Sequence, residues 1–146
     1  MRKVLVVLPI AAVLIGLGAV SAGAGPGTVH QVTVPPADRF TPFALTIRAG
    51  DTVRWTNNDE DDHTVVSDSA FDTTGHKGTD RLLGADGGKV TLHFPHVGTF
   101  VYYCRFHARL DAFNQPVAPG PDGGIEDPPG NFGTPMSGVI TVLPAN

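Results

Sequence analysis

The chain contains a single cysteine, Cys104, and a histidine follows it three residues later, at His107. Because there is no second cysteine, Cys104 cannot form an internal disulfide, which leaves an intermolecular bridge, a reactive thiol or a metal thiolate. The residues before it, Val101-Tyr102-Tyr103, are β-branched or aromatic and predict a strand that ends at the cysteine. A thiolate and an imidazole at the end of one strand form a candidate metal site.

Two further residues could complete such a site, His63 and Met136. His63 closes a polar loop that follows a predicted strand, and Met136 stands directly before the last predicted strand. Two imidazoles, one thiolate and one thioether match the trigonal His₂Cys site with a weak axial Met that holds copper for electron transfer. Zinc would be better served by more thiolates or by a fourth nitrogen or oxygen ligand. The predicted metal ligands are therefore His63, Cys104, His107 and Met136, around one copper ion.

Short strands separated by turns must position these residues. Runs of β-branched and alternating apolar residues predict strands at 28–34, 45–48, 52–57, 64–66, 89–94, 99–104 and 139–143. One turn of helix is expected near 80–83, within an otherwise irregular connection over 67–87. Residues 113–135 are rich in Pro and Gly and predict an irregular loop. No stretch has the spacing of a long amphipathic helix, so the fold class is all-β, a sandwich or a barrel.

The first 24 residues predict a cleaved export signal. Basic residues at Arg2 and Lys3 precede an apolar run over 4–20, and small residues follow at Ser21–Ala24. The run has 17 residues, which is short for a membrane span of ~20; an uncleaved anchor is the alternative. We expect one domain over 25–146 in the periplasm or outside the cell. It would carry eight basic and 14 acidic residues, which excludes a general nucleic-acid binder.

Four segments together carry a specific combination of motifs. They are Phe43–Asn57, His63-Thr64-Val65, Gly98–His107 and Met136–Val142. In order and spacing they resemble the cupredoxin family of small type 1, or blue, copper proteins, which includes plastocyanin, pseudoazurin and amicyanin. The resemblance implies a Greek-key antiparallel β-sandwich with copper at one end. It also implies that His63, Cys104 and His107 are equatorial ligands, that Met136 is the axial ligand, and that the copper cycles between Cu(I) and Cu(II) to carry electrons.

The chain departs from the family pattern after His107. In the family the axial Met follows the second His within a few residues, whereas here an insertion of 28 residues, 108–135, lies between His107 and Met136. Lengthening a loop from about 4 to 28 residues costs only about 1.7 kcal/mol, because closure entropy grows with the logarithm of length. The strand pattern after Met136 is intact, so we keep it as a predicted ligand; a core residue at a strand start is the alternative. The insertion also begins beside the histidine that is the family's electron exit.

The remaining polar residues have less specific roles. The other four histidines are expected to be exposed and not to bind metal: His30, His76, His93 and His96. The run Asp59–Asp62 precedes His63 and predicts either a solvated loop or an acidic patch that steers a basic redox partner. A partner protein would dock near His107 and this run. We expect a monomer without a membrane span after signal cleavage.

Three functions stay open at this level, and an electron carrier is favoured among them. A copper carrier that delivers its metal to another protein would use the same ligands, and a metal-free β-sandwich binding module would leave Cys104 incidental. A copper oxidase is disfavoured, because multicopper enzymes that resemble this fold link their centres through histidines flanking the Cys. The neighbours here are Tyr103 and Arg105, so we expect no enzymatic activity.

Overall fold

The computed structural model describes residues 27–68, 72, 74–75, 78–120, 124–125 and 133–146. The predicted export signal and His76 lie outside these residues. The described part consists of strands and turns and contains no helix, and thus none that is long and apolar enough to cross a membrane. The predicted all-β fold class is confirmed.

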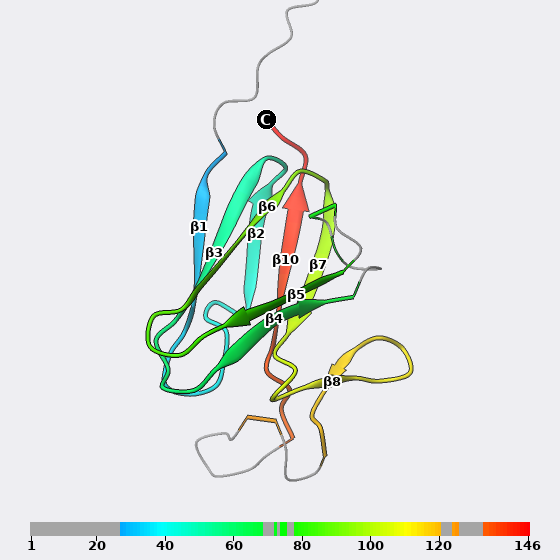
Figure 1. Ribbon diagram of the computed structural model, residues 1–146. Helices are drawn as coiled ribbons and strands as arrows, with labels where there is room; N and C mark the ends of the chain where they lie inside the picture. Colours follow the sequence, from blue (N-terminus) through cyan, green and yellow to red (C-terminus); the bar gives the residue numbers. More distant parts are fainter. Residues whose placement is uncertain (1–26, 69–71, 73, 76–77, 121–123, 126–132) are drawn as a thin grey trace, which may run out of the picture.

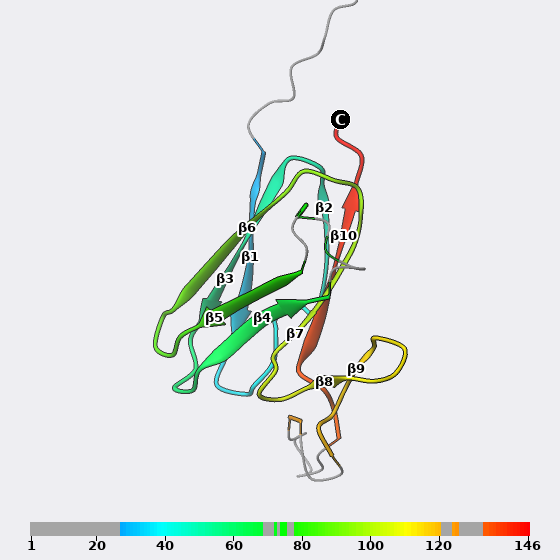
Figure 2. The ribbon, with the colours of Figure 1, turned by 45° about the vertical axis from the view of Figure 1, so that its right-hand side comes forward.

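Two sheets form a sandwich (Figure 1). One sheet has the order β1 (Val29–Val34), β3 (Asp51–Asn57), β6 (Lys89–Phe94). The other has the order β2 (Ala44–Arg48), β10 (Ser137–Leu143), β7 (Gly98–Tyr103), β4 (His63–Ser67), β5 (Thr79–Leu83). A separate two-stranded hairpin, β8 (Arg109–Leu110) and β9 (Pro116–Val117), projects beside the lower end of the sandwich (Figure 2).

Two of the neighbouring pairs are parallel, β1 with β3 and β2 with β10. A parallel neighbour requires a crossover connection rather than a hairpin. β2 supplies it for the first pair, since it lies between β1 and β3 in the sequence but belongs to the other sheet. The other long pairings, such as β10 with β7 and β3 with β6, are antiparallel as expected.

The core between the sheets follows the alternation of the strands. In β3 the side chains of Val53 and Trp55 are buried, and in β6 those of Val90, Leu92 and Phe94. The Trp55 ring lies at the centre of an aromatic cluster, with ring centroids 6.5 Å from Phe94, 6.4 Å from Phe100 and 5.3 Å from Tyr102. Interiors of this kind are packed as densely as organic crystals. The cluster therefore gives β7, which leads into Cys104, a rigid support.

Two local predictions were wrong. The expected helical turn near 80–83 is strand β5, which pairs residue by residue with β4 from His63↔Leu83 to Ser67↔Thr79. Only the ends of β5 are buried, Thr79 and Leu83, so its sequence lacks the alternation that identifies a strand. The irregular loop expected over 113–135 contains strand β9, which pairs with β8. Its Pro116 has only one neighbouring strand, as is usual for proline in a sheet.

The candidate ligands lie at the opposite end of the sandwich from Gly27, the first described residue, and from Asn146. His63 opens β4 and Cys104 follows β7. The start of β4 and the end of β7 lie at the lower end in Figure 1. The C-terminal Asn146 lies at the upper end in Figure 1, and it lines one surface hollow together with Gly27 and Asp51. The site is therefore built by strand ends and loops, on a frame that the sheets hold fixed.

Gly138 is a position where the fold requires glycine for close approach. A Cβ atom built on Gly138 would lie 2.5 Å from both Cζ and Oη of Tyr102. The Tyr102 ring cannot move aside, because it is buried between Phe40 and Trp55 at centroid distances of 4.8 and 5.3 Å. We expect Gly138→Ala to lower the free energy of unfolding by about 1–3 kcal/mol through overpacking.

Denaturant or thermal unfolding measures this effect. Gly120→Ala is the matched control, since no atom lies within 4 Å of a Cβ at Gly120 and its φ is not positive. Equal stability of the two variants would contradict the close packing of β10 on Tyr102.

Candidate metal centre

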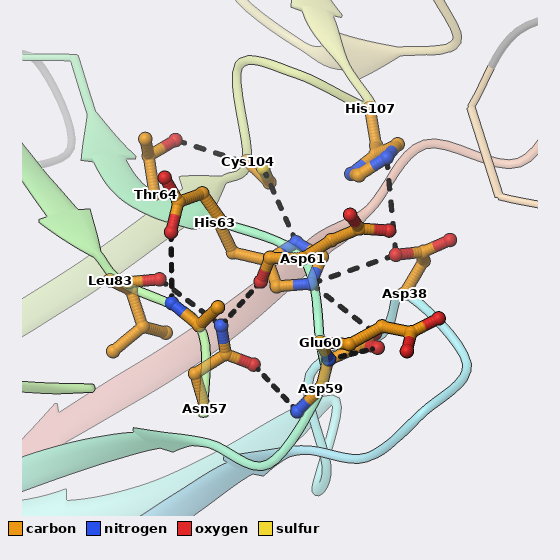
Figure 3. Close-up of polar contacts among 12 residues, drawn as sticks. Asp38, Asn57, Asp59, Glu60, Asp61, His63, Thr64, Leu83, Cys104 and His107 are labelled. Carbon is orange, nitrogen blue, oxygen red and sulfur yellow. Dashed lines mark hydrogen bonds and ion pairs between the residues drawn. The ribbon is translucent and has the colours of Figure 1, made fainter. Parts of the chain in front are cut away.

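Three predicted ligands come together at the lower end of the sandwich. One nitrogen of His63, the Sγ atom of Cys104 and one nitrogen of His107 all lie within 4.8 Å of one another. The Nδ1 atom of His63 is 3.8 Å from the Cys104 sulfur. His63 and Cys104 are fully buried, whereas 24 % of the His107 side chain is exposed. Figure 3 shows His63, at the start of β4, in contact with the sulfur, and His107 nearby on the segment that follows Cys104.

Sheet pairing and one tight turn position these side chains. β4 and β7 are neighbours and pair at Val66↔Tyr103, which brings the start of β4 and the end of β7 together. The Thr64 hydroxyl joins the two segments, because it accepts a hydrogen bond from the Arg105 amide at 3.0 Å and donates to the Cys104 sulfur at 3.8 Å. The His107 amide donates to the Cys104 carbonyl at 3.1 Å. This turn places the second imidazole beside the thiol.

Met136 is tied to the same residues through its main chain. Its carbonyl accepts from the Cys104 amide at 3.0 Å, and its amide donates to the His107 carbonyl at 3.3 Å. Its side chain is 1 % exposed and belongs to the core cluster that includes Cys104. The insertion over 108–135 thus leaves and rejoins the sandwich at adjacent points. Its length does not separate Met136 from the other three residues.

The donor set fits a copper ion. The Nδ1 atom of His107 is buried and makes no hydrogen bond with any described residue. A buried ring nitrogen without a partner carries a desolvation penalty that a bound metal would remove. Thiolate and thioether groups suit Cu(I), and imidazole suits copper in general. The residues present would therefore hold copper through His63, Cys104 and His107, with Met136 next to them.

Electrostatics in the cluster favour the ionised thiol. Burial by itself would raise the pKa of Cys104, but the nearby imidazoles of His107 and His63 outweigh it and lower that pKa from 9.0 to about 6. Burial also opposes the charged form of His63, yet Cys104, Asp59 and Asp38 raise its pKa. The Cys104 contact raises the pKa of His107 more than burial lowers it. The thiolate that a metal requires is thus already present at neutral pH.

A pH titration of the metal-free protein tests this. We expect the ultraviolet absorbance of the thiolate to be present at neutral pH and to disappear as the pH falls through about 6, the lowered pKa of Cys104. Copper binding should weaken below that pH, because a proton must then be displaced. Cys104→Ser is the control that removes the transition. A midpoint near 9 would show that the imidazoles do not stabilise the thiolate.

Two carboxylates beside the cluster did not emerge as site residues from the sequence. Asp59 Oδ2 lies 3.4 Å from His63 Nε2, and Asp38 Oδ1 lies 3.6 Å from the same atom. These two residues and His63 form a second group of close ligand atoms. Asp59 stands four residues before His63 within the acidic run, and this closeness in sequence could have indicated a contact between the two side chains. No sequence pattern links Asp38, in the connection between β1 and β2, to the site.

The acidic run divides into inward and outward residues. Asp59 is buried, and Asp62 Oδ1 accepts a hydrogen bond from the Ala85 amide at 2.9 Å. Glu60, Asp61 and Asp62 are exposed. The run therefore supplies both a contact to His63 and a smaller acidic surface.

The other histidines lie away from the cluster or outside the described residues. His93 and His96 are exposed, as expected. The expectation for His30 was wrong: it is half-buried, and its Nε2 atom lies 2.9 Å from Asp51 Oδ2 at the opposite end of the sandwich. None of these described histidines is part of a group of ligand atoms with Cys104.

Comparisons with known proteins agree with this chemistry. A family model described as copper-binding proteins of the plastocyanin/azurin family matches residues 31–111. The chain is 36% identical over 72 residues to the chloroplastic plastocyanin of Tetradesmus obliquus, covering 47% of this chain and 50% of that protein. It is 33% identical over 72 residues to the plastocyanin of Scenedesmus fuscus, covering 47% and 74%. The chain thus spans half the length of the first of these relatives.

Solved structures show the same fold. An oxidized amicyanin variant superimposes with a TM-score of 0.52 at 18% identity, covering 77% of this chain and 80% of the other. A Cu(I) amicyanin variant gives 0.53 at 19% identity, covering 84% and 88%. At this identity the likeness concerns the fold alone, whereas the family match spans more than half of the chain and includes His63, Cys104 and His107. The chain belongs to the plastocyanin/azurin family of copper-binding proteins.

Proposed function

We propose that this protein is a one-electron carrier with a single type 1 copper ion held by His63, Cys104, His107 and Met136. The observation that carries the proposal is the cluster of two imidazoles and one thiol within 4.8 Å, in which His63 and Cys104 are buried. The main-chain hydrogen bonds of Met136 to Cys104 and His107 support its assignment as the axial ligand. Bound copper would supply a reversible Cu(I)/Cu(II) couple, and no substrate would be transformed.

The protein frame suits electron transfer because it holds the ligands in one geometry. The Thr64 hydroxyl donates a hydrogen bond to the Cys104 sulfur, and a main-chain hydrogen bond closes the turn from Cys104 to His107. The aromatic cluster around Trp55 packs against Tyr102 of β7. A site of this kind reorganises little when the charge on the metal changes, which keeps electron transfer fast.

Electrons would enter and leave through the edge of His107. Of the two imidazoles, His107 is the one with an exposed fraction, 24 %, while His63 has none. Two exposed aromatic residues, Phe106 and Phe113, lie close to it in the sequence. A redox partner would dock over His107, and the exposed residues Glu60 and Asp61 would attract basic groups on it.

A copper delivery protein is the second candidate, since it would use the same ligands. Burial of His63, Cys104 and Met136 favours retention of the metal over rapid transfer to another protein. A metal-free binding module would leave the Nδ1 atom of His107 buried without a partner. Both observations favour the carrier.

The visible spectrum of the copper-loaded protein, followed by voltammetry on the same sample, tests the proposal. We expect an intense blue colour from charge transfer between thiolate and copper, and a reversible one-electron wave. A colourless protein after copper titration would overturn the type 1 site. Rapid loss of Cu(I) to a competing chelating protein during redox cycling would favour delivery instead.

The cellular location stays a prediction. We infer export to the periplasm or the cell exterior from the N-terminal sequence pattern, with the mature domain starting at residue 25. Amino-terminal sequencing of the protein purified from its natural source tests the cleavage site. Retention of Met1 in a membrane fraction would favour an anchor.

A further inference from the structure

The edges of both imidazoles that face away from Cys104 lie against carboxylates. His63 Nε2 is 3.4 Å from Asp59 Oδ2 and 3.6 Å from Asp38 Oδ1. His107 Nε2 is 3.9 Å from the same oxygen of Asp38. Asp38 therefore contacts both rings, and Asp59 contacts the same nitrogen of His63 that Asp38 does (Figure 3).

Asp59 is held in place by its own hydrogen bonds. Its amide donates to Asn57 Oδ1 at 3.0 Å, and its Oδ1 accepts from the Glu60 amide at 2.8 Å. The Asn57 side chain is in turn anchored, because its Nδ2 donates to the carbonyls of Asp61, Leu83 and Gly84 at 2.7 to 3.2 Å. This network leaves Oδ2 of Asp59 directed at His63.

Asp38 reaches the site from the connection between β1 and β2. Its φ of 49° is a left-handed conformation, which Asp tolerates better than most residues. Its Oδ1 is buried and makes no hydrogen bond with a described residue, although 37 % of the side chain is exposed. A buried carboxylate oxygen without a donor is costly. The N–H groups of the two imidazoles are the donors that could satisfy it.

The nitrogen assignment makes such donors available. Nδ1 of His63 faces the sulfur and Nδ1 of His107 is buried without a partner, so a metal bound at these atoms leaves Nε2 protonated on both rings. A carboxylate that accepts from the remote N–H of a metal-bound histidine fixes its tautomer and orientation and increases its basicity. A nearby negative charge also favours the more highly charged metal state.

We propose that Asp59 and Asp38 are positioning residues that orient both copper-ligand imidazoles and, through their charge, favour Cu(II) over Cu(I). Asp38 is shared between His63 and His107, so a single side chain couples the orientations of both rings. This inference rests on the proposed function, because it concerns the same site. It adds that the reduction potential is set in part by residues outside the ligand set.

The test uses Asp59→Asn and Asp38→Asn in the copper-loaded protein. Asn keeps the shape of Asp and can still accept the Glu60 amide hydrogen bond at position 59. We expect both variants to remain blue and to bind Cu(II) about 10–100-fold more weakly, as is typical when such outer partners are lost. The potential should rise, by about 59 mV for each tenfold change in the ratio of Cu(II) to Cu(I) affinity. The copper hyperfine splitting in electron paramagnetic resonance should change as the rings reorient.

Glu60→Gln is the matched control. It removes one negative charge from the neighbouring residue, which is exposed and forms no ion pair with either imidazole among the described residues. Equal potentials and identical hyperfine splittings in all three variants would overturn the positioning role while leaving the blue site intact. A wild-type protein that never turns blue would overturn the proposed function, and this inference with it.

Discussion

We expect Cys104→Ser to produce a folded protein that does not turn blue when copper is added. The blue colour requires charge transfer from a thiolate, and the chain has no other cysteine to supply one. A hydroxyl at this position is a poor copper ligand and is protonated at neutral pH. Titration with Cu(II), followed by visible absorption and electron paramagnetic resonance, measures the result. Any copper that remains bound should give the spectrum of an ordinary nitrogen and oxygen site.

Retention of the fold must be checked in the same sample. The Cys104 side chain is fully buried, so a serine there costs about 1–3 kcal/mol if its hydroxyl finds no partner. The Thr64 hydroxyl lies 3.8 Å from the sulfur and can satisfy part of that demand. A cooperative unfolding transition would show that loss of colour reflects the ligand and not the fold. Undiminished colour in this variant would show that the thiolate assignment is wrong.

We expect substitutions of Met136 to change the reduction potential in opposite directions. Met136→Leu removes the thioether and leaves an apolar group beside the metal, which disfavours Cu(II) and raises the potential. Met136→Gln supplies an oxygen ligand, which favours Cu(II) and lowers the potential, since the axial ligand tunes such sites. A tenfold change in the affinity ratio corresponds to about 59 mV. Both variants should stay blue, because the thiolate remains.

The paired design separates a ligand from a core residue. Met136 is 1 % exposed, so both substitutions alter packing and both can lower stability. A purely structural residue would affect the unfolding midpoint without opposite shifts in potential. Voltammetry and denaturant unfolding on each variant therefore distinguish the two roles. Equal potentials in wild type, Leu and Gln proteins would remove Met136 from the site.

The strands that shape the core were predictable because their side chains alternate. β3 and β6 bury every second residue. The same alternation of apolar and polar residues is visible in their sequences. β5 gave no such signal, since three consecutive residues inside it are exposed. It is a strand because β4 offers it a partner along its whole length. Pairing of this kind is a tertiary property that local sequence does not encode.

The same distinction applies to the candidate site. Cys104 and His107 are close in the chain, and one turn sets their geometry, so their spacing was informative. His63 and Met136 were selected because they stand next to predicted strands. In the structure His63 belongs to the cluster, and the main chain of Met136 is hydrogen-bonded to Cys104 and His107. Their role as ligands stays a prediction. Asp38 reaches the site only because the two sheets fold over each other, and its residue type alone gave no reason to select it.

The placement of Asn146 has a practical consequence. Gly27 and Asn146 lie together at one end of the sandwich, while His63, Cys104 and His107 lie at the other. A linker that joins the C-terminus to an electrode would therefore hold the molecule upright, with the His107 edge directed toward the solution. Current from such a film would have to cross the length of the sandwich. Attachment through a residue of the β8–β9 hairpin would instead bring the metal end to the conducting surface and shorten the tunnelling path.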